Sequence, residues 1–422
     1  MSDAIGIYQF VPPYVEQVVL SHYEKQSSGT LQAVQGSIHS SRSYVLLQKT
    51  SIEFALKVRY EKYTSFSANI IHAGPPSIPP SSSLGAVGGA SSPNQASSSV
   101  STSPKEVWDG SLKRLVLSSS VTSLKTTDTA ALSCYKNLGE VDEFYRRVFQ
   151  KPPVDTRTKL MKAFVHDPNA FNNAYWMPST ESIYYGEVDP NLFKPLVGNL
   201  DICVHEYGHA VTHYTSNLQY QDQSGALNES ISDVFAIIAK QDFLKQKADD
   251  ANTNWLVGEV VVGGGALRSM SNPGSAYKNH PIMGSDPQPA HMNDYVKMAT
   301  DNGGVHYNSG IPNRAFYLAA KNIGGSSTGA GQIWFNTLIA SKKTDDFSDF
   351  ANRSISIAQS LRGDNISNIV AKAWTDVGVD LRKPATPSQQ APDPSNHIFS
   401  FPCCCGCLTL GAILAIIMAP TK

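Results

Sequence analysis

The sequence VHEYGHAVTHY, residues 204–214, carries the pattern on which the interpretation of this 422-residue chain depends. In an α-helix, side chains four residues apart share a face, so His205 and His209 can grip one metal ion. Glu206 projects about 100° around the helix from His205, close enough to touch a metal-bound water without binding the metal. Alone, a His-Glu-x-x-His string arises by chance in roughly one per cent of chains this long. A second signal is therefore needed.

A downstream segment offers the ligand that two histidines lack, since a catalytic zinc needs three protein ligands and one open position for water. In SGALNESISDVF, residues 224–235, Glu229 begins a helical pattern and Asp233 lies one turn further on the same face. A carboxylate ligand and a carboxylate that orients a ligating histidine are the expected pair. Without HEYGH, two acids favoured by the dipole of a helix's first turn would be an equal explanation. We interpret His213, which continues the four-residue series, as a surface or supporting histidine.

Together these motifs make the chain resemble the thermolysin family of zinc metallopeptidases. The resemblance covers about residues 106–379 and implies an α+β, two-lobed thermolysin-like fold. Its N-terminal lobe would be β-rich and its C-terminal lobe mainly helical, with the active-site helix between them. The strings that recur in the family's order are NNAYW (172–176), HEYGHAVT (205–212), SGALNESISD (224–233), LRSMSNP (267–273) and DNGGVHYNSGIPN (301–313).

The resemblance implies a zinc-dependent endopeptidase with one catalytic Zn²⁺. The zinc ligands would be His205, His209 and Glu229, and Asp233 would hydrogen-bond His205. Zinc lowers the pKa of bound water towards about 7 and polarises the scissile carbonyl. Glu206 would take the proton of that water as general base and return it to the leaving amine.

The developing negative charge on the carbonyl oxygen needs hydrogen-bond donors. The resemblance assigns this role to His306, with Tyr220 assisting and Asp301 holding the imidazole. Without its DNGGVHYNSG context, His306 would be better explained as a histidine in a glycine-rich turn.

Substrate recognition is likewise implied by the resemblance. Arg268 would hydrogen-bond the substrate backbone just after the cut, a role suited to a fixed guanidinium. Asn173 and the Ala174 backbone would form the edge along which an extended peptide lies. The main pocket would favour a bulky apolar residue just after the cut, although its lining residues could equally be ordinary core residues. They are Phe193, Leu196, Ile202, Val257, Val261 and Leu267.

Composition and periodicity divide the chain into segments. Residues 74–104 are rich in Ser, Pro and Gly and are predicted to be a disordered linker. Strands are expected within 107–121 and 175–185, and the helices that we expect span 132–149, 200–214, 230–245, 308–320, 330–339, 345–361 and 365–377. The predicted domains are a precursor-like leader (1–73), the linker, a β-rich catalytic lobe with the HEYGH helix (105–216), a helical catalytic lobe (217–380) and a Pro/Ser linker with a Cys-rich apolar tail (381–422).

The leader contains FVPPYVEQVV, residues 10–19, which resembles the Pro-Pro-Tyr segment in the short precursors of protealysin-like members. This implies a zymogen in which the N-terminal region covers the cleft as an intramolecular inhibitor until it is cleaved, in the linker. The alternative is a disordered extension without that role.

The calcium cluster of the family is expected to be absent. Asp201 and Glu259 match two of its carboxylates, but Lys240 stands where a carboxylate that bridges two Ca²⁺ ions is expected. Asn254 and Leu256 replace two further acids. We expect the Lys240 ammonium to neutralise Asp201 and Glu259 in place of the metal.

Charge and targeting signals limit the remaining options. With 34 basic and 35 acidic residues, the chain has a net charge of −1 and no bias towards nucleic acid. The first 20 residues lack the pattern of a signal peptide, so a cytoplasmic or non-classically secreted protein is expected. Cys403, Cys404, Cys405 and Cys407 adjoin a short apolar run and could be S-acylated, which would associate the tail with a membrane. An incorrectly predicted gene end is the alternative.

Two rival functions remain. A pseudoprotease on the same scaffold would lack a zinc ligand or the base, and neither is missing from the sequence. An aminopeptidase of the HExxH type would have to recognise a free amino group, for which the sequence has no added motif. Proteins or peptides are therefore the expected substrates.

Overall fold

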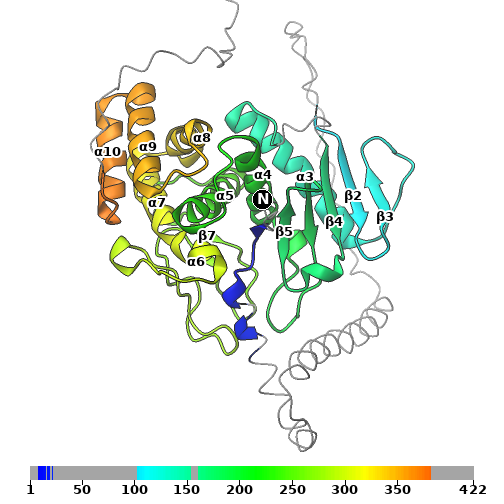
Figure 1. Ribbon diagram of the computed structural model, residues 1–422. Helices are drawn as coiled ribbons and strands as arrows, with labels where there is room; N and C mark the ends of the chain where they lie inside the picture. The colour runs from blue at the N-terminus through cyan, green and yellow to red at the C-terminus, as the bar shows by residue number, and fades with distance from the viewer. Residues whose placement is uncertain (1–7, 16, 20, 22–101, 154–159, 382–422) are drawn as a thin grey trace, which may run out of the picture. The chain divides into compact units, whose positions relative to one another are not determined.

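The structure is a computed structural model that describes residues 8–15, 17–19, 21, 102–153 and 160–381 (Figure 1). The predictions for most of the leader, for nearly all of the linker and for the tail after residue 381 lie outside the described residues. Among the helices within these ranges, none has the length and apolar character needed to cross a membrane.

The N-terminal lobe is built on a sheet of six described strands, in the order β1-β5-β6-β4-β2-β3. β4 runs parallel to β2 and β6, and the other neighbours are antiparallel. Along β4, Met161, Ala163 and Val165 are buried and alternate with partly exposed residues, so one face of the sheet is the packed face. The strands are β1 (Tyr8–Gln9), β2 (Lys105–Asp109), β3 (Arg114–Ser118), β4 (Met161–Val165), β5 (Ala174–Met177) and β6 (Ser182–Tyr185).

Two helices lie against this sheet. α3 (Thr129–Phe144) begins at Asp128, whose carboxylate accepts hydrogen bonds from the backbone amides of Ala130 and Ala131. α4 (Leu200–Tyr214) is the HEYGH helix, and all of its residues from 201 to 212 are buried. Such all-round burial shows that α4 is the central helix, packed on the sheet on one side and on α5 on another.

The C-terminal lobe is mainly helical, as the resemblance implied. Its aromatic core includes Trp334 and Trp374, whose rings stack with centroids 6.0 Å apart. A short strand pair, β7 (Leu256–Val257) with β8 (Arg268–Ser269), lies beside these helices. The helices are α5 (Asp222–Phe243), α6 (Asp301–Asn308), α7 (Gly310–Ile323), α8 (Gly331–Ala340), α9 (Phe347–Arg362) and α10 (Asp364–Asp376).

The predicted α+β fold class is confirmed, with one instructive error in an element boundary. α5 begins at Asp222, eight residues before the predicted start at residue 230. Glu229 therefore lies inside the helix, and the alternative that placed it and Asp233 in a first turn is wrong. The segment was missed because its small and polar residues have no apolar periodicity, while tertiary packing keeps it helical.

That packing depends on Gly208, within HEYGH. A Cβ atom at Gly208 would lie 2.7 Å from the Cα atom of Ser232, so any other residue would push α5 away from α4. Close contact between these two helices is what allows a side chain of α5 to reach the histidines of α4.

The described part of the leader extends the sheet. β1 pairs antiparallel with β5, with Tyr8 opposite Trp176 and Gln9 opposite Tyr175. Phe10 and Val11 are fully buried. Figure 1 shows this blue segment running between the sheet and the helical lobe, so the alternative of a disordered extension is wrong for these residues.

Candidate active site

Three buried side chains from two helices converge on one point. The Nε2 atoms of His205 and His209 lie 3.1 Å apart. The carboxylate oxygens of Glu229 lie 3.4 Å from the first of these atoms and 3.5 Å from the second. A tetrahedral ion with bonds of about 2.0–2.1 Å holds its ligand atoms roughly 3.3–3.5 Å apart. The three side chains therefore fit a zinc site, and no other such group of potential metal ligands occurs among the described residues.

Hydrogen bonds on the far side of each ring orient the two imidazoles. Nδ1 of His205 lies 2.9 Å from Oδ1 of Asp233, and Nδ1 of His209 lies 2.8 Å from Oδ1 of Asn228. Because both partners are acceptors, each Nδ1 carries a proton, and Nε2 is the ring nitrogen that faces the shared point. Metal-ligating histidines in proteins are held in the same way.

The electrostatics favour a cation at this point. Burial lowers the pKa of His209 to about 3, so its imidazole is neutral. Burial opposes ionisation of Glu229, but the charge of the nearby His306 outweighs it and lowers the pKa of this carboxyl below its usual range. A neutral imidazole and an ionised carboxylate are the protonation states that a metal ion requires.

Glu206 is fully buried. Neither of its oxygens meets the hydrogen-bond criteria with a partner within the described structure, although the backbone of Trp176 is near enough to act on its pKa. Burial raises the pKa of Glu206 to about 8. Burying an unpaired carboxylate costs several kcal/mol, so the site fits a bound cation and its water as the missing partners.

His306 faces the same point from α6. Residues 302–304 have a left-handed backbone, which turns Asp301 back so that its Oδ1 lies 2.6 Å from Nδ1 of His306. Burial lowers the pKa of His306, but the charges of Glu229 and Asp301 outweigh this and raise it to about 9. His306 is therefore protonated at neutral pH. Its Nε2 lies 3.3 Å from the hydroxyl of Tyr220, which itself donates to Glu229. Two donors are thus gathered beside the three potential ligands.

Arg268, in β8, is fully buried and held by a carboxylate. Its Nε donates to Oδ2 of Asp233 at 2.8 Å and to Oδ1 at 3.0 Å. Asn313 donates to the same carboxylate at 2.9 Å. Asp233 therefore fixes both a potential zinc ligand and the guanidinium, whose Nη1 donates to the backbone carbonyl of Phe10 at 2.8 Å.

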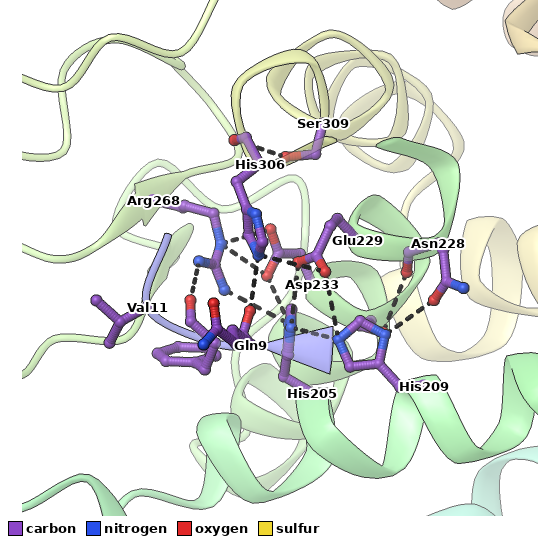
Figure 2. A network of polar contacts seen from close by, with 12 residues as sticks. Gln9, Val11, His205, His209, Asn228, Glu229, Asp233, Arg268, His306 and Ser309 are labelled. Atoms are coloured by element: carbon purple, nitrogen blue, oxygen red, sulfur yellow. Dashed lines mark hydrogen bonds and ion pairs between the residues drawn. The ribbon is translucent and has the colours of Figure 1, made fainter. Parts of the chain in front are cut away.

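The leader occupies the edge of β5 that we predicted for a peptide. The Phe10 amide donates to the Ala174 carbonyl at 2.9 Å. The Val11 amide donates to Oδ1 of Asn173 at 2.8 Å, and Nδ2 of Asn173 donates back to the Val11 carbonyl at 3.2 Å. Figure 2 shows His306 and Arg268 directed at this backbone, with His205 and His209 beside it.

The side chain of Phe10 lies in an apolar pocket beside the potential ligands. Its ring meets that of His205 edge to face at 4.9 Å, and the Arg268 guanidinium lies 4.4 Å from its centroid. Gly258 forms one wall of the pocket: a Cβ atom there would lie 2.9 Å from Phe10 Cζ, and the φ of +69° favours glycine.

The predicted pocket residues are all buried, but their described contacts differ. Leu267 lies beside Gly258, since a Cβ atom added to Gly258 would be 3.4 Å from the Cβ atom of Leu267. Val257 accepts a hydrogen bond from the Leu267 amide. Phe193 forms a β-bridge with Val261, while Leu196 and Ile202 are buried in the same hydrophobic core.

A second carboxylate cluster lies nearby, around Lys240. The ammonium donates to Asp201 at 3.1 Å, to the Leu256 carbonyl at 2.8 Å and to Glu259 at 2.5 Å. The same Asp201 oxygen also accepts the backbone amide of Gly258 at 3.0 Å. The Lys240 cluster, defined as Lys240, Asp201 and Glu259, therefore supports the loop that forms the pocket wall.

Sequence reasoning missed three residues of this site. Asn228 and Asn313 hold His209 and Asp233, and Gly258 gives space to the Phe10 ring. The available signal was that Asn228, a polar residue, directly precedes Glu229 in the sequence. His213 is half-buried, lies against Tyr214 and is not part of the potential zinc site, in agreement with our interpretation.

Comparisons with known proteins agree with this geometry. The thermolysin metallopeptidase catalytic domain matches residues 85–213, and the alpha-helical domain of the same metallopeptidases matches residues 216–379. An extracellular metalloprotease of Pectobacterium carotovorum is 40% identical over 263 residues, which are 61% of this chain and 74% of that protein. Protease PrtS of a Photorhabdus species is 38% identical over 265 residues, which are 61% and 70% of the two chains.

A solved structure is similar as well. The precursor of protealysin, a metalloproteinase from Serratia proteamaculans, matches with a TM-score of 0.62 and 36% identity. The match covers 67% of this chain and 91% of that one. The fold, the convergent ligand set and both domain matches lead to one conclusion: the chain belongs to the thermolysin metallopeptidase family and is a zinc metalloendopeptidase.

Proposed function

We propose that this enzyme cuts internal peptide bonds just before a bulky apolar residue and is made as a zymogen inhibited by its own leader. One observation carries the proposal. An extended segment of the chain lies along the edge of β5 with an aromatic side chain in the pocket beside the potential zinc ligands.

In this proposal His205, His209 and Glu229 hold the zinc ion. When bound, zinc supplies Lewis acidity and lowers the pKa of a water towards about 7. Glu206, whose oxygens have no hydrogen-bond partner among the described residues, accepts a proton from the attacking water and passes it to the leaving nitrogen. This residue is the general base.

His306 and Tyr220 act on the oxygen of the scissile carbonyl. Both can donate hydrogen bonds, and Asp301 fixes the His306 ring. Donors that are already in place when charge develops stabilise a transition state more than donors that must reorganise.

Substrate is held by the groups that hold the leader. Asn173 and the Ala174 carbonyl bind the extended backbone, and Arg268 binds the carbonyl that follows the cut. The apolar residues around Gly258 select the side chain that follows the cut. The aromatic ring of Phe10 is a guide to the size of residue that this pocket accepts.

The leader blocks the cleft because it uses these same groups. Tyr8 stacks on His209 with centroids 4.9 Å apart, and the Gln9 carbonyl lies 2.7 Å from Nε2 of His306. A substrate cannot bind until this segment leaves. The match to the protealysin precursor is consistent with that role.

We also propose that the Lys240 cluster replaces the double calcium site. The ammonium already pairs with Asp201 and Glu259. Burial opposes ionisation of Glu259, but the hydrogen bond and charge of Lys240 help to outweigh it and lower the pKa of this carboxyl. A divalent ion would have to displace a cation that is covalently part of the chain.

Cleavage of a peptide blocked at both ends tests the proposed function. We expect a cut before a bulky apolar residue, loss of activity with a zinc chelator, and loss in Glu206→Gln. Cleavage only of peptides with a free amino terminus would assign an aminopeptidase instead. A chain that binds zinc and peptide without cutting would be a pseudoprotease.

A further inference from the structure

We propose that the Gln9–Phe10 peptide bond of the chain is its own first cleavage site. This inference rests on the proposed function and goes further, because it states that the leader lies in the register of a substrate. A segment that only covered the cleft would not need to align one particular bond with the catalytic groups.

Backbone contacts on both sides of the bond define the register. Before the bond, the Gln9 carbonyl accepts a hydrogen bond from Nε2 of His306 at 2.7 Å. After it, the Phe10 amide donates to the Ala174 carbonyl at 2.9 Å, and the Phe10 carbonyl accepts from Arg268 at 2.8 Å. The group that stabilises charge on a scissile carbonyl therefore faces Gln9, and the group that holds the next carbonyl faces Phe10.

Side chains give the same register. Tyr8 stacks on His209 at 4.9 Å with the ring planes 18° apart, and Phe10 meets His205 edge to face at 4.9 Å. The two rings thus pack on the two histidine ligands, and the bond between Gln9 and Phe10 lies between them. Phe10 is fully buried in the pocket for the residue after the cut.

Hydrolysis at this bond balances with water as the only co-reactant. Water adds to the carbonyl carbon of Gln9 while Glu206 accepts one of its protons. The C–N bond to Phe10 then breaks, and the proton passes to the nitrogen. The products are a peptide of residues 1–9 that ends in a carboxylate and a chain that begins with the amine of Phe10.

The cut would release only one side of the leader. Residues 1–9 lose their covalent link to the segment that Arg268, Asn173 and Ala174 hold, so the contacts of Tyr8 and Gln9 are free to dissociate. The new end at Phe10 keeps its own contacts. The cut is therefore a first step that opens one half of the cleft.

The test uses the full chain, prepared free of metal with a chelator and then supplied with Zn²⁺. Intact mass and N-terminal sequencing should show loss of residues 1–9 and the new sequence Phe-Val-Pro-Pro-Tyr. The rate should not change with protein concentration, because the cut is intramolecular. Glu206→Gln should remain uncut. An active enzyme, shown by its cleavage of a blocked peptide, that leaves Gln9–Phe10 intact would overturn the inference.

Two further arms test the register itself. Phe10→Leu should still be cut, whereas Phe10→Asp should slow this cut by roughly 100-fold because a carboxylate is rejected by an apolar pocket. In metal-free Glu206→Gln, hydrogen exchange at the Phe10 and Val11 amides should be slow, and free exchange there would contradict the register. If neither this bond nor a blocked peptide is cut, the proposed function fails together with the inference.

Discussion

Two carboxylate clusters around α4 and α5 differ in the partners that balance their negative charge. Around His205 and His209, both oxygens of Glu206 and one oxygen of Glu229 lack a hydrogen-bond partner within the described structure. In the Lys240 cluster, Asp201 accepts from the ammonium and from a backbone amide, and Glu259 pairs with the same ammonium. These three oxygens have no hydrogen-bond donor within the described residues, whereas an ammonium of the chain itself pairs with both carboxylates of the second cluster. Unmet negative charge thus marks where a metal ion belongs.

Removing a ligand from the first cluster should have the largest effect. In Glu229→Ala the site loses one of three ligands, so we expect loss of bound zinc and a fall in activity on the order of 10³-fold or more. Glu259→Gln is the matched control, because it removes one charge from the Lys240 cluster. Metal analysis and a peptide hydrolysis assay would measure the zinc content and the activity of both variants. Zinc retained in Glu229→Ala would contradict the assignment of Glu229 as a zinc ligand.

Removing the base should separate chemistry from metal binding. Glu206→Gln keeps all three ligands, so its zinc content should equal that of the unmodified chain. Its kcat should fall by roughly 10²–10⁴-fold, the usual contribution of a general base. A variant with normal zinc and normal kcat would show that the unpaired carboxylate has another role.

The Lys240 cluster should govern stability and not the reaction. Lys240→Met leaves two carboxylates without their cation, and we expect a loss of about 1–3 kcal/mol, reduced from the fully buried case because Glu259 is 39% exposed. Thermal unfolding would measure this loss.

Calcium titration sharpens the same point. The unmodified chain should show no calcium-dependent rise in Tm, whereas Lys240→Glu, with three acids together, should acquire one. A strong rise in the unmodified chain that disappears in Asp201→Asn would show that the site binds calcium after all.

The smallest effect is expected at Gly258, which connects the two clusters through its amide and the pocket. Gly258→Ala would place a methyl group against a bulky side chain, so kcat/KM for peptides with Phe after the cut should fall about 10-fold relative to peptides with Val. Profiling a peptide library would measure the ratio. An unchanged ratio would mean that Gly258 does not limit the pocket.

The sequence predicted the helical lobe and the metal-binding pattern because both depend on short-range spacing. Four residues between His205 and His209 place them on one face of α4 whatever the surroundings are. The ion pairs of Lys240 with Asp201 and Glu259 were likewise expected from the residue types, and the structure has both. These features needed no knowledge of distant contacts.

Other features depend on contacts between distant segments and could not be predicted. β1 has only two residues, which is too short for an alternation of buried and exposed side chains to appear. The start of α5 at Asp222 follows from packing against α4 and has no apolar pattern of its own. The need for glycine at position 258 comes from its contact with the Phe10 ring, and Phe10 is far from Gly258 in the sequence.

X-ray absorption at the zinc edge of the purified full chain tests the central claim most directly. We predict one zinc per chain with two imidazole nitrogens and a carboxylate oxygen at about 2.0–2.2 Å, unchanged in Glu206→Gln. Sulfur ligands at about 2.3 Å, or a chain that cleaves peptides without zinc, would contradict it.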